Sequence, residues 1–394
     1  MTTDYVEQAL NLREKLIERR RDFHRHPELA FEENRTASIV ASTLSELGLE
    51  VQTGVGKTGV VGILEGDQPG PTILVRADMD ALPIREETGA AYASETPGKM
   101  HACGHDGHTS IALGVAELLT PLRDKIHGRV KFVFQPAEEI GKGANAMVAD
   151  GVMNDPAPDV SVGLHLWNSL PVGYVGMAEG PVMAGALTFN ITIRGKGGHA
   201  ASPQFTIDPV VCAAQIVTAF QSIVSRNTDP FESAVVSVTQ INAGEAYNVI
   251  PQFAELKGTV RYFREDVSEL VTRRMKQIAE HIAAAMECVA EIEFSSMTQP
   301  VVNNGRVRER LLPVFENIVE QGKIDAIRTM GAEDVGVFMN DVPGVYFFVG
   351  AKDETADHYY PHHHPRFTID EEALPLGLAL LTSAVAEYVL PQAD

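Results

Sequence analysis

The stretch T-I-L-V-R-A-D-M-D, residues 72–80, decides the fold class of this chain. It begins as a short β-rich run, and two carboxylates, Asp78 and Asp80, follow where that strand is expected to end. Open α/β sheets place their ligand sites outside the carboxyl ends of their strands. The stretch therefore predicts a strand that carries acidic side chains to a functional site.

Helix-like and strand-like segments alternate on both sides of residues 72–80. Further strands are expected over 59–64, 130–134, 160–166 and 345–349. Helices are expected over 6–24, 33–47, 307–320 and 370–389, and another begins after residues 103–105. This alternation predicts an α/β domain with a mixed sheet that is covered by helices.

The pattern changes near Gly185. Apolar residues alternate with polar ones from Leu187 to Arg194, with the period of two that is typical of an antiparallel strand with one wet face. A helix over 209–225, strands over 234–241 and 254–263, and an amphipathic helix over 267–286 follow. We therefore expect a discontinuous catalytic domain, residues 1–185 and 299–394, interrupted by an α+β lid-like domain, residues 186–298, with the two crossings as hinges.

Length and composition exclude several classes of protein. The chain has 394 residues, of which 44% are hydrophobic, and a formal net charge of −21. So acidic a balance argues against a nucleic acid or an anionic membrane as partner. No signal peptide is visible and no apolar run approaches the length of a membrane span, so a cytoplasmic protein is expected. The three scattered cysteines suit a reducing compartment.

Metal-ligating side chains gather in C-G-H-D-G-H, residues 103–108. Cys103 and His105 are separated by one glycine, whose flexible backbone would let both side chains face one ion. Asp106 and His108 are expected to support the ligands or to begin the following helix. The competing interpretations are a loop cysteine beside a surface histidine, and a thiol nucleophile with His105 or His108 as its base.

Further candidate ligands follow other predicted strands and loops. They are Glu138 and Glu139 after the strand over 130–134, His165 near the end of the strand over 160–166, and the triplet His362, His363 and His364. By themselves the two glutamates could form a solvated turn, and His165 could be a core histidine. Three consecutive histidines cannot all point inward, so one ligand from the triplet is expected.

Together these residues predict about five ligands drawn from segments spread over some 260 positions. A structural zinc usually takes four Cys or His ligands from two close pairs, whereas this set includes carboxylates and leaves one glutamate over. Adjacent carboxylates point in different directions, so one can bind metal while the other takes a proton from metal-bound water. We therefore expect two divalent ions and a hydrolytic reaction.

In this order, the segments resemble the aminoacylase and carboxypeptidase superfamily of di-metal amidohydrolases. The most similar branch contains hippurate hydrolase, bacterial N-acyl-L-amino acid amidohydrolases and plant indole-acetyl-amino-acid hydrolases. The segments that carry the resemblance are 24–29 (H-R-H-P-E-L), 76–83 (R-A-D-M-D-A-L-P), 100–108 (M-H-A-C-G-H-D-G-H), 135–139 (Q-P-A-E-E), 197–199 (G-G-H) and 331–334 (G-A-E-D). The resemblance implies a mixed-sheet di-metal hydrolase domain with an inserted lid and dimerisation domain.

The resemblance also implies the roles of individual residues. The implied metal ligands are Cys103, His105, Glu139, His165 and, from the His-x-Pro-x-Phe spacing, His363. Glu138 would be the general base, and Asp80 would orient a ligand. The wider superfamily has His-x-Asp where this chain has Asp78-Met79-Asp80, so the ligand set of aminoacylase itself does not transfer.

Three residues of the inserted domain receive roles from the resemblance alone. His199 would stabilise the oxyanion and reach into the site of a second subunit, while Asn248 and Arg261 would hold the substrate carboxylate. By itself His199 is a histidine at a Gly-rich hairpin tip, and Arg261 is a strand-end surface charge. The resemblance implies a homodimer or homotetramer.

The favoured hypothesis is a metal-dependent amidohydrolase that cleaves N-acetyl, N-benzoyl or similar N-acyl L-amino acids to a carboxylate and a free amino acid. Its cofactors would be two ions of zinc, manganese, cobalt or nickel. A metallocarboxypeptidase that acts on short peptides is the alternative within the same class. A third hypothesis is a non-catalytic protein in which metal only staples the fold, and the presence of Glu138 and His199 disfavours it because such a protein needs neither.

Overall fold

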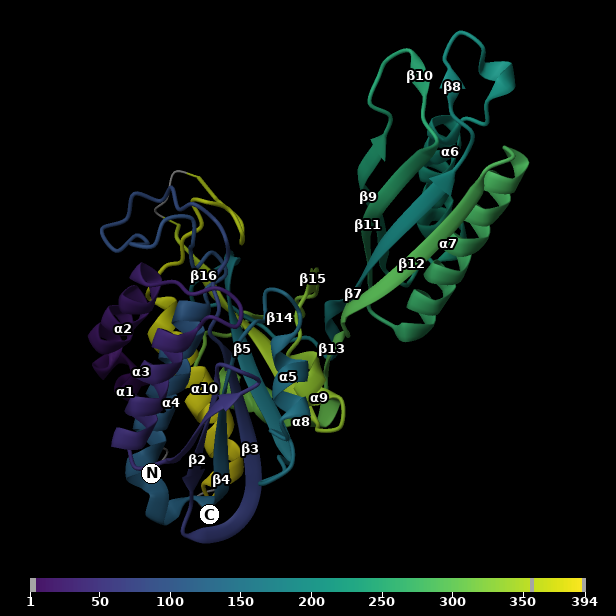
Figure 1. Cartoon of the computed structure of the whole chain (residues 1–394). Helices are drawn as coiled ribbons and strands as arrows, with labels where there is room; N and C mark the ends of the chain where they lie inside the picture. Colours follow the sequence, from purple (N-terminus) through teal and green to yellow (C-terminus); the bar gives the residue numbers. More distant parts are fainter. Residues whose placement is uncertain (1–4, 355–357, 392–394) are drawn as a thin grey trace. The chain divides into compact units, whose positions relative to one another are not determined.

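The computed structural model describes residues 5–354 and 358–391, which divide into two units (Figure 1). The first unit contains Met1–Val182, Val301–Arg328 and Asp334–Asp394, and the second contains Met183–Pro300 and Thr329–Glu333. The chain therefore leaves the first unit after its first half and returns to complete it.

An eight-stranded mixed sheet is the framework of the first unit. Its strands follow the order β1-β2-β4-β3-β5-β16-β6-β14. They are β1 (Glu50–Val55), β2 (Gly59–Glu65), β3 (Gln68–Asp78), β4 (His127–Gln135), β5 (Val160–Pro171), β6 (Val175–Gly176), β14 (Ile324–Asp325) and β16 (Gly344–Lys352). The central strands β4, β3, β5 and β16 run parallel, whereas β1 pairs antiparallel with β2 and β2 antiparallel with β4. The predicted α/β class with a mixed sheet is confirmed.

Two buried helices pack against the centre of this sheet. These are α4 (His105–Leu119) and α10 (Ala373–Val389), which contact each other and β3. Nearly every residue of both helices is buried, as expected for a helix inside a core rather than on a surface. Because α4 begins at His105, this packing holds one end of the C-G-H segment firmly against the sheet.

The remaining helices of the first unit are shorter or lie nearer the surface. They are α1 (Tyr5–Asn11), α2 (Arg13–Arg25), α3 (Asn34–Glu46), η1 (Thr120–Lys125), α5 (Gly143–Ala149), α8 (Gly305–Glu316) and α9 (Gly336–Met339). The single helix that was expected over 6–24 is present as α1 and α2, which meet at Leu12. None of the helices in the described part of the chain is long and apolar enough to cross a membrane.

The second unit is an antiparallel sheet with two long helices on one face. Its main strands lie in the order β12 (Val289–Thr298), β7 (Gly180–Arg194), β11 (Phe253–Tyr262) and β9 (Ala234–Ala243). The helices are α6 (Pro209–Ser222), which continues as η3 (Ile223–Asn227), and α7 (Glu265–Ala285). The predicted alternation in β7 is confirmed, because Leu187, Phe189, Ile191 and Ile193 are buried in one core cluster with residues of both helices. The short elements are β8 (Gly198–His199), η2 (Pro203–Phe205), β10 (Val249–Ile250) and β15 (Thr329–Ala332), and β13 (Val301–Asn303) begins the return to the first unit.

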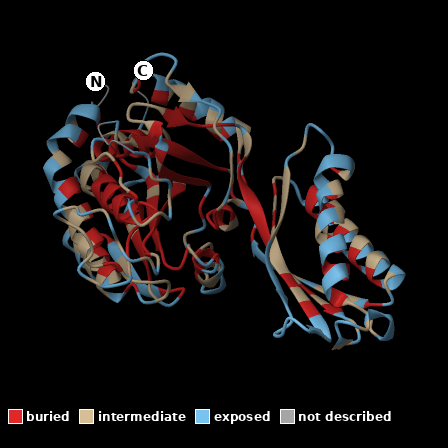
Figure 2. Cartoon of the chain, turned by 90° about the horizontal axis from the view of Figure 1, so that it is seen from above, coloured by how far each residue is buried: buried red, intermediate tan, exposed pale blue. Residues whose placement is uncertain are grey.

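Each unit has its own hydrophobic core. Figure 2 shows buried residues throughout the sheet of the first unit, and in the second unit along the strands and the inner side of the helices. Two separate cores mean that the packing which holds the candidate ligands can be analysed within the first unit alone.

Candidate metal centre

Three neighbouring strands of the first unit deliver candidate ligands to one edge of its sheet. β3 ends at Asp78, with Asp80 just beyond it, and β4 ends shortly before Glu138 and Glu139. His165 lies inside β5, because that strand continues to Pro171, so the expected strand end near His165 was wrong. The pairing of β5 with β3 nevertheless stops at the pair Arg76–Gly163, so His165 lies two residues beyond the last residue of β5 that is paired with β3.

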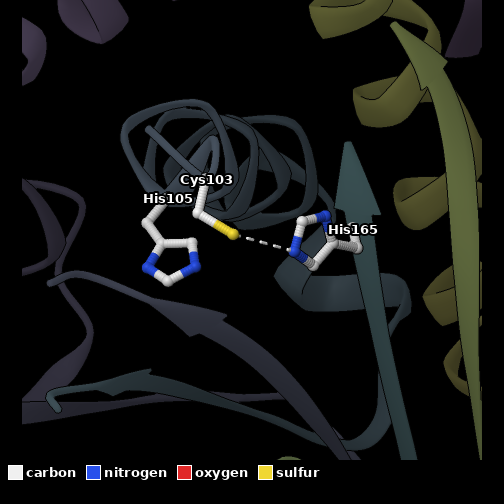
Figure 3. Close-up of side chains that lie close together, drawn as sticks. All are labelled: Cys103, His105 and His165. Atoms are coloured by element: carbon white, nitrogen blue, oxygen red, sulfur yellow. Dashed lines mark hydrogen bonds between the residues drawn. The ribbon is translucent and has the colours of Figure 1, made fainter. Parts of the chain in front are cut away.

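Cys103 and His105 reach the same edge from the start of α4 (Figure 3). Gly104 between them has φ of 98°, a left-handed conformation that glycine adopts without a steric penalty. The Sγ atom of Cys103 lies 3.6 Å from Nε2 of His165, and the rings of His105 and His165 have their centroids 6.2 Å apart. All three side chains are buried. The local backbone at Gly104 therefore does turn both side chains of the C-G-H segment inward.

The glutamate pair lies on the other side of His105. Nε2 of His105 is 3.9 Å from Oε2 of Glu138 and 3.9 Å from Oε1 of Glu139. The carboxylate of Asp80 accepts the backbone N–H groups of Glu138, at 3.1 Å, and Glu139, at 3.0 Å. Its backbone carbonyl accepts Nδ1–H of His105 at 2.9 Å, which directs Nε2 of His105 toward the glutamates. Asp80 thus orients three of the candidate site residues at once.

The histidine triplet contributes one residue to this cluster. Nε2 of His363 lies 3.3 Å from Oε2 of Glu139, while His362 bonds to a backbone carbonyl and His364 accepts the backbone N–H of Arg366. His363 has φ of 67°, which is unusual for a residue other than glycine, and its N–H donates to the carbonyl of Ala102 at 2.8 Å. Strained conformations of this kind cluster at functional sites.

Burial makes the ionised forms of several of these groups costly. It raises the pKa of the Cys103 thiol well above its usual range and lowers the pKa of His165 well below its usual range. Burial also raises the pKa of Glu139 to about 8, a rise that His105 opposes and Asp80 supports. A divalent cation offsets these costs, because it selects the thiolate, the carboxylate and the neutral imidazole.

The donor set fits divalent cations. Nε2 of His105 and Oε1 of Glu139 are buried without a hydrogen-bond partner among the described residues, although buried polar atoms are normally paired. Possible ligand atoms lie within 4.8 Å of one another in five groups, three of which join the candidate ligands: Cys103 with His105 and His165, Cys103 with Glu139 and His363, and His105 with Glu138 and Glu139. Cys103, His105 and Glu139 each belong to two of these three groups, so the groups form one connected set of donors that would hold the ions. Thiolate, imidazole and carboxylate together suit zinc and its first-row neighbours.

Asp78 forms hydrogen bonds with His108 and Arg76, neither of which is a candidate ligand. Its Oδ1 accepts Nδ1–H of His108 at 2.6 Å and its Oδ2 accepts NH1 of Arg76 at 2.7 Å, while Nε2 of His105 is 3.6 Å from Oδ2. Burial opposes ionisation of this carboxyl, but its interactions with His105, Arg76 and His108 hold its pKa well below the usual range. Asp78 therefore supports the cluster as a fixed carboxylate.

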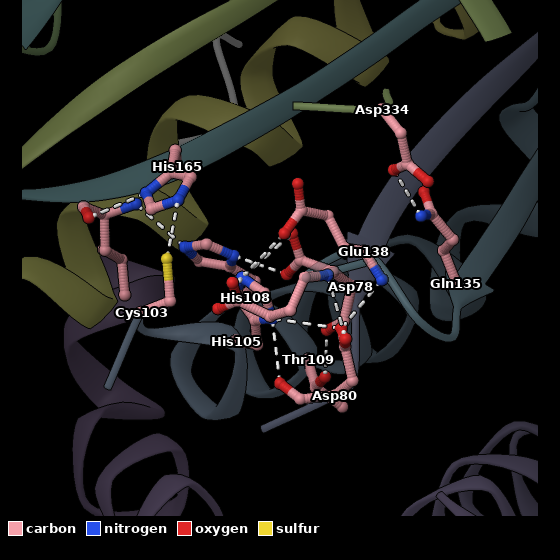
Figure 4. A network of polar contacts seen from close by, with 12 residues as sticks. Asp78, Asp80, Cys103, His105, His108, Thr109, Gln135, Glu138, His165 and Asp334 are labelled. Atoms are coloured by element: carbon pink, nitrogen blue, oxygen red, sulfur yellow. Dashed lines mark hydrogen bonds and ion pairs between the residues drawn. The ribbon is translucent and has the colours of Figure 1, made fainter. Parts of the chain in front are cut away.

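A buried chain of hydrogen bonds extends this support to Asp334 (Figure 4). Arg76 donates from Nε to Oε1 of Gln135 at 2.8 Å, and Gln135 donates from Nε2 to Oδ1 of Asp334 at 2.6 Å. The other oxygen of Asp334 accepts the N–H of Ala144 at 3.0 Å. Sequence reasoning assigned no role to Arg76, Gln135 or Asp334, although all three lie in segments that carried the family resemblance.

Asp106 secures the start of α4 from the other side. It forms ion pairs with Nε of Arg20 at 2.8 Å and Nδ1 of His24 at 2.7 Å, and all three side chains are buried. Both Asp106 and His108 thus lie in the first turn of the helix and support it, as the sequence predicted. The ligand-bearing end of α4 is held by polar networks on two faces.

The remaining candidate residues belong to the second unit. His199 in β8 is paired with Val249 in β10, and the carbonyl of Asn248 accepts the N–H of Ala200 at 3.1 Å, so His199 and Asn248 are close neighbours. Arg261 lies opposite Ala186 in the ladder of β11 with β7. His199 and Asn248 lie beyond the other end of that ladder, which is about 26 Å away at about 3.3 Å per residue. Arg261 therefore does not share a local site with His199 and Asn248.

Comparisons with known proteins identify the family of this chain. Residues 74–387 match the family described as peptidase family M20/M25/M40. The chain is 41% identical to N-acetylcysteine deacetylase of Bacillus subtilis, covering 92% of this chain and 94% of that protein. It is 39% identical to thermostable carboxypeptidase 2 of Saccharolobus solfataricus, covering 95% and 96%.

Other relatives extend the range of named activities. IAA-amino acid hydrolase ILR1-like 2 of Arabidopsis thaliana is 38% identical, covering 96% of this chain and 86% of that protein. The crystal structure of the Bacillus subtilis YXEP protein, described as a dinuclear metal binding peptidase of the M20 family, superimposes with a TM-score of 0.82. It is 36% identical in sequence and covers 96% of this chain and 98% of that one. The family match, the relatives and the solved structure each cover most of this chain. The chain therefore belongs to peptidase family M20/M25/M40 and is a metallo-amidohydrolase or peptidase of that family.

Proposed function

We propose that this protein hydrolyses the amide bond of N-acyl L-amino acids and releases a carboxylate and a free amino acid. The observation that carries the proposal is Glu138, a carboxylate that lies 3.9 Å from His105 and is oriented by Asp80, beside the five candidate ligands. A metal ion that only stabilises the fold does not require an additional carboxylate beside its ligands. The named activities of two relatives, an N-acetylcysteine deacetylase and an IAA-amino acid hydrolase, support this substrate class.

The five proposed ligands are Cys103, His105, Glu139, His165 and His363. They would hold two divalent ions of zinc, manganese, cobalt or nickel. Such ions, when bound, lower the pKa of a coordinated water to near neutrality and polarise the substrate carbonyl. The description of the YXEP protein as a dinuclear metal binding peptidase supports the number of ions.

Glu138 is the proposed general base. Its backbone N–H is fixed by Asp80, so its carboxylate is presented next to the ligand cluster on a short, well-held loop. We propose that a carboxylate oxygen of Glu138 takes a proton from the attacking water and transfers it to the nitrogen of the leaving amino acid.

The second unit would supply the groups that bind the rest of the substrate. Nδ1 of His199 accepts the N–H of Ala201 at 3.1 Å, so the ring carries its hydrogen on Nε2. That hydrogen is the donor that we assign to the oxyanion of the tetrahedral intermediate. Asn248, beside His199, and Arg261, in β11 of the larger sheet of the second unit, are assigned to the substrate carboxylate. Their separation within one chain favours a site that takes Arg261 from one subunit and His199 with Asn248 from another.

We further propose that the second unit is a lid that also carries the interface of a homodimer or homotetramer. β9 is an edge strand of its sheet, and an unprotected edge is a ready surface for pairing with a second copy. Ile241 on that strand and Val210 and Val211 on α6 are exposed apolar side chains. Size measurement in solution tests this part of the proposal, and a strictly monomeric, fully active enzyme contradicts it.

A metallocarboxypeptidase that acts on short peptides is the second candidate. The specific observation that favours it is the 39% identity to thermostable carboxypeptidase 2, which lies between the 41% identity to N-acetylcysteine deacetylase and the 38% identity to IAA-amino acid hydrolase ILR1-like 2. Both reactions use the same centre, and they differ in the group on the acyl side of the scissile bond.

A substrate panel separates the two candidates. N-acetyl, N-benzoyl and indole-acetyl amino acids and matched dipeptides are assayed with purified protein that has been treated with chelator and reloaded with each metal. Higher kcat/KM for N-acyl amino acids than for dipeptides supports the first candidate, and the reverse order supports the second. Full activity without metal would contradict both and would favour Cys103 as a nucleophile.

Paired variants test whether Glu138 acts as the general base and Glu139 as a metal ligand. Glu138→Gln is expected to keep two ions and to lose about 10²- to 10⁴-fold in kcat, the usual contribution of a general base. Glu139→Gln is the matched control, since it removes the neighbouring carboxylate and is expected to lose metal. A Glu138→Gln enzyme with two ions and undiminished turnover refutes the proposed role of Glu138.

A further inference from the structure

We propose that the backbone of Leu166 is a positioning hub of the metal centre, with its N–H bonded to His108 and its carbonyl bonded to His362. This inference rests on the ligand set proposed above. Through the backbone of Leu166, His108 and His362 would fix the tautomer of His165 and the location of His363. Neither His108 nor His362 touches the substrate in this account, and both act through the ligands.

The N–H side of the hub sets the tautomer of His108. The N–H of Leu166 donates to Nε2 of His108 at 2.9 Å, which requires that this ring nitrogen carry no hydrogen. Nδ1 of His108 therefore carries the hydrogen and donates it to Asp78 at 2.6 Å. Arg76 holds the other oxygen of Asp78 at 2.7 Å, so the carboxylate cannot turn away. All of these side chains are buried, and Figure 4 shows His108 of α4 beside Asp78 of β3.

The carbonyl side of the hub sets the tautomer of His165. The oxygen of Leu166 accepts from Nδ1 of His165 at 2.9 Å, and a carbonyl can only accept. His165 therefore carries its hydrogen on Nδ1 and keeps a lone pair on Nε2. That Nε2 atom is the one that lies 3.6 Å from Sγ of Cys103 (Figure 3). The hub thus presents the neutral ligand form of His165 to the proposed metal position, as outer partners of ligating histidines commonly do.

The same carbonyl also anchors the histidine triplet. Nε2 of His362 donates to the oxygen of Leu166 at 3.1 Å, and the His362 ring packs against Trp167 with centroids 4.6 Å apart. The next residue, His363, has the left-handed φ of 67° and lies beside Glu139. A strained backbone persists only where its surroundings over-determine it. Two residues connect this segment to β5: His362, and Asn168 of β5, whose Nδ2 donates to the carbonyls of Tyr360 and Thr368. His362 is directly bonded to His363 in the chain, and it thereby helps to hold His363 where a ligand is needed.

The test compares variants that break the hub with variants that preserve its hydrogen bonds. His362→Phe keeps an aromatic ring against Trp167 but removes the donor to Leu166, whereas His362→Gln retains an N–H donor. His108→Leu and His108→Gln form the equivalent pair for the N–H side. His364→Phe is the matched control, since His364 stacks on Tyr360 with centroids 4.6 Å apart and does not bond to Leu166.

Metal binding is the first readout. Zinc affinity is measured by titration of chelator-treated protein, with the fluorescence of Trp167, the one tryptophan of the chain, as signal. Its ring lies 5.3 Å from that of His165, so it reports on the site directly. His362→Phe and His108→Leu are expected to bind one of two ions about 10- to 100-fold more weakly, as found when partners of ligands are removed. The two Gln variants recover part of this loss, and His364→Phe retains parental affinity.

The absorption spectrum of the cobalt-loaded protein is the second readout, because thiolate-to-cobalt and d–d bands report ligand geometry and do not respond to stability alone. Both hub-breaking variants are expected to shift these bands, and kcat should fall while KM stays near the parental value. Parental affinity and spectra in His362→Phe and His108→Leu overturn the inference, provided that the parent binds two ions. A parent that binds fewer than two ions instead contradicts the proposed centre. If His108→Leu does not fold, His362→Phe, in a loop outside the core helices, decides the question.

Discussion

Glu139→Gln is expected to stabilise the protein against unfolding when chelator is present, although it removes a proposed ligand. Burial, together with the charge of Asp80, raises the pKa of Glu139 from 4.5 to about 8, against the opposing charge of His105. This rise corresponds to about 5 kcal/mol at about 1.4 kcal/mol for each tenfold change in the acidity constant. The figure is an upper limit on the cost of ionising this carboxyl in the folded protein.

The sign of the pH dependence follows from the direction of the pKa shift. Below pH 4.5 the carboxyl is protonated in both states and costs nothing. Between pH 4.5 and about 8 the unfolded chain releases the proton while the folded protein retains it, so the free energy of unfolding falls as the pH rises. Glutamine has no proton to lose. The variant should therefore match the parent near pH 4.5 and exceed it by about 3 kcal/mol at pH 7.

Urea unfolding in the presence of chelator measures this difference at several pH values. Trp167 is the reporter, because it belongs to the first unit and its ring lies 5.3 Å from that of His165. Glu46→Gln, at an exposed position of α3, is the control and should stay within about 0.5 kcal/mol of the parent throughout. Zinc should reverse the order, since a ligand at 1,000 times its dissociation constant stabilises the folded state by about 4 kcal/mol.

Two results would refute this reasoning. Parent and variant curves that stay parallel from pH 5 to pH 8 mean that the pKa of Glu139 is not raised by its surroundings. A variant that gains as much stability from zinc as the parent means that Glu139 is not a ligand.

Three further predictions concern other parts of the site. Asp106→Asn should lower the free energy of unfolding by about 3 kcal/mol at pH 7 in urea titrations, because it leaves the buried Arg20 with an incomplete ion pair. Burial opposes ionisation of Asp106, but Arg20 and His24 hold its pKa below the usual range, so the parent's advantage should shrink as the pH falls below about 4. Gly143→Ala should abolish turnover, because a Cβ atom there would lie 1.5 Å from the carbonyl oxygen of Pro136 and displace the loop of Glu138. Gly114→Ala, whose Cβ would meet only the side chains of Leu16 and Leu378 at 3.1 Å, should keep most activity in the same assay. Metal binding should release protons, and its affinity should increase as the pH rises from 6 to 8, because the pKa values of Cys103 and Glu139 are raised. Calorimetry in two buffers of different ionisation enthalpy measures the number of protons released. Metal binding without proton release contradicts the prediction.

Much of the fold could be predicted because its central strands are short apolar runs with distinct ends. The strand over 345–349 is β16, and all but the last residue of this strand are buried. β1 was missed because Glu50–Val55 is polar and mostly exposed, as an edge strand often is. β12 was not predicted, although Ala290, Ile292 and Phe294 alternate with acidic residues. This alternation is the pattern expected of a strand with one buried face.

The clustering of Cys103, His105, Glu138 and Glu139 could be predicted because these side chains follow strands or begin a helix, whereas His165 lies inside β5 and the choice of His363 came from the family resemblance. The support of the ligand cluster could not be predicted in the same way. The hub at Leu166 consists of a backbone N–H and a backbone carbonyl, which every residue other than proline possesses and no sequence pattern marks. Asp334 lies far along the chain from Gln135 and Arg76, and only the return of the chain to the first unit brings them together.

The interruption of the first unit has a consequence for synthesis on the ribosome. Residues of the second unit from Met183 to Pro300 are contiguous and can fold as soon as they emerge. The first unit cannot, because β16 lies between β5 and β6 in its sheet and α10 fills its core, and both follow the second unit in the chain. His363 also follows the second unit. The nascent chain therefore carries most of the proposed ligands before it has the geometry to hold two ions, and the centre can form only once β16, His363 and α10 have been translated.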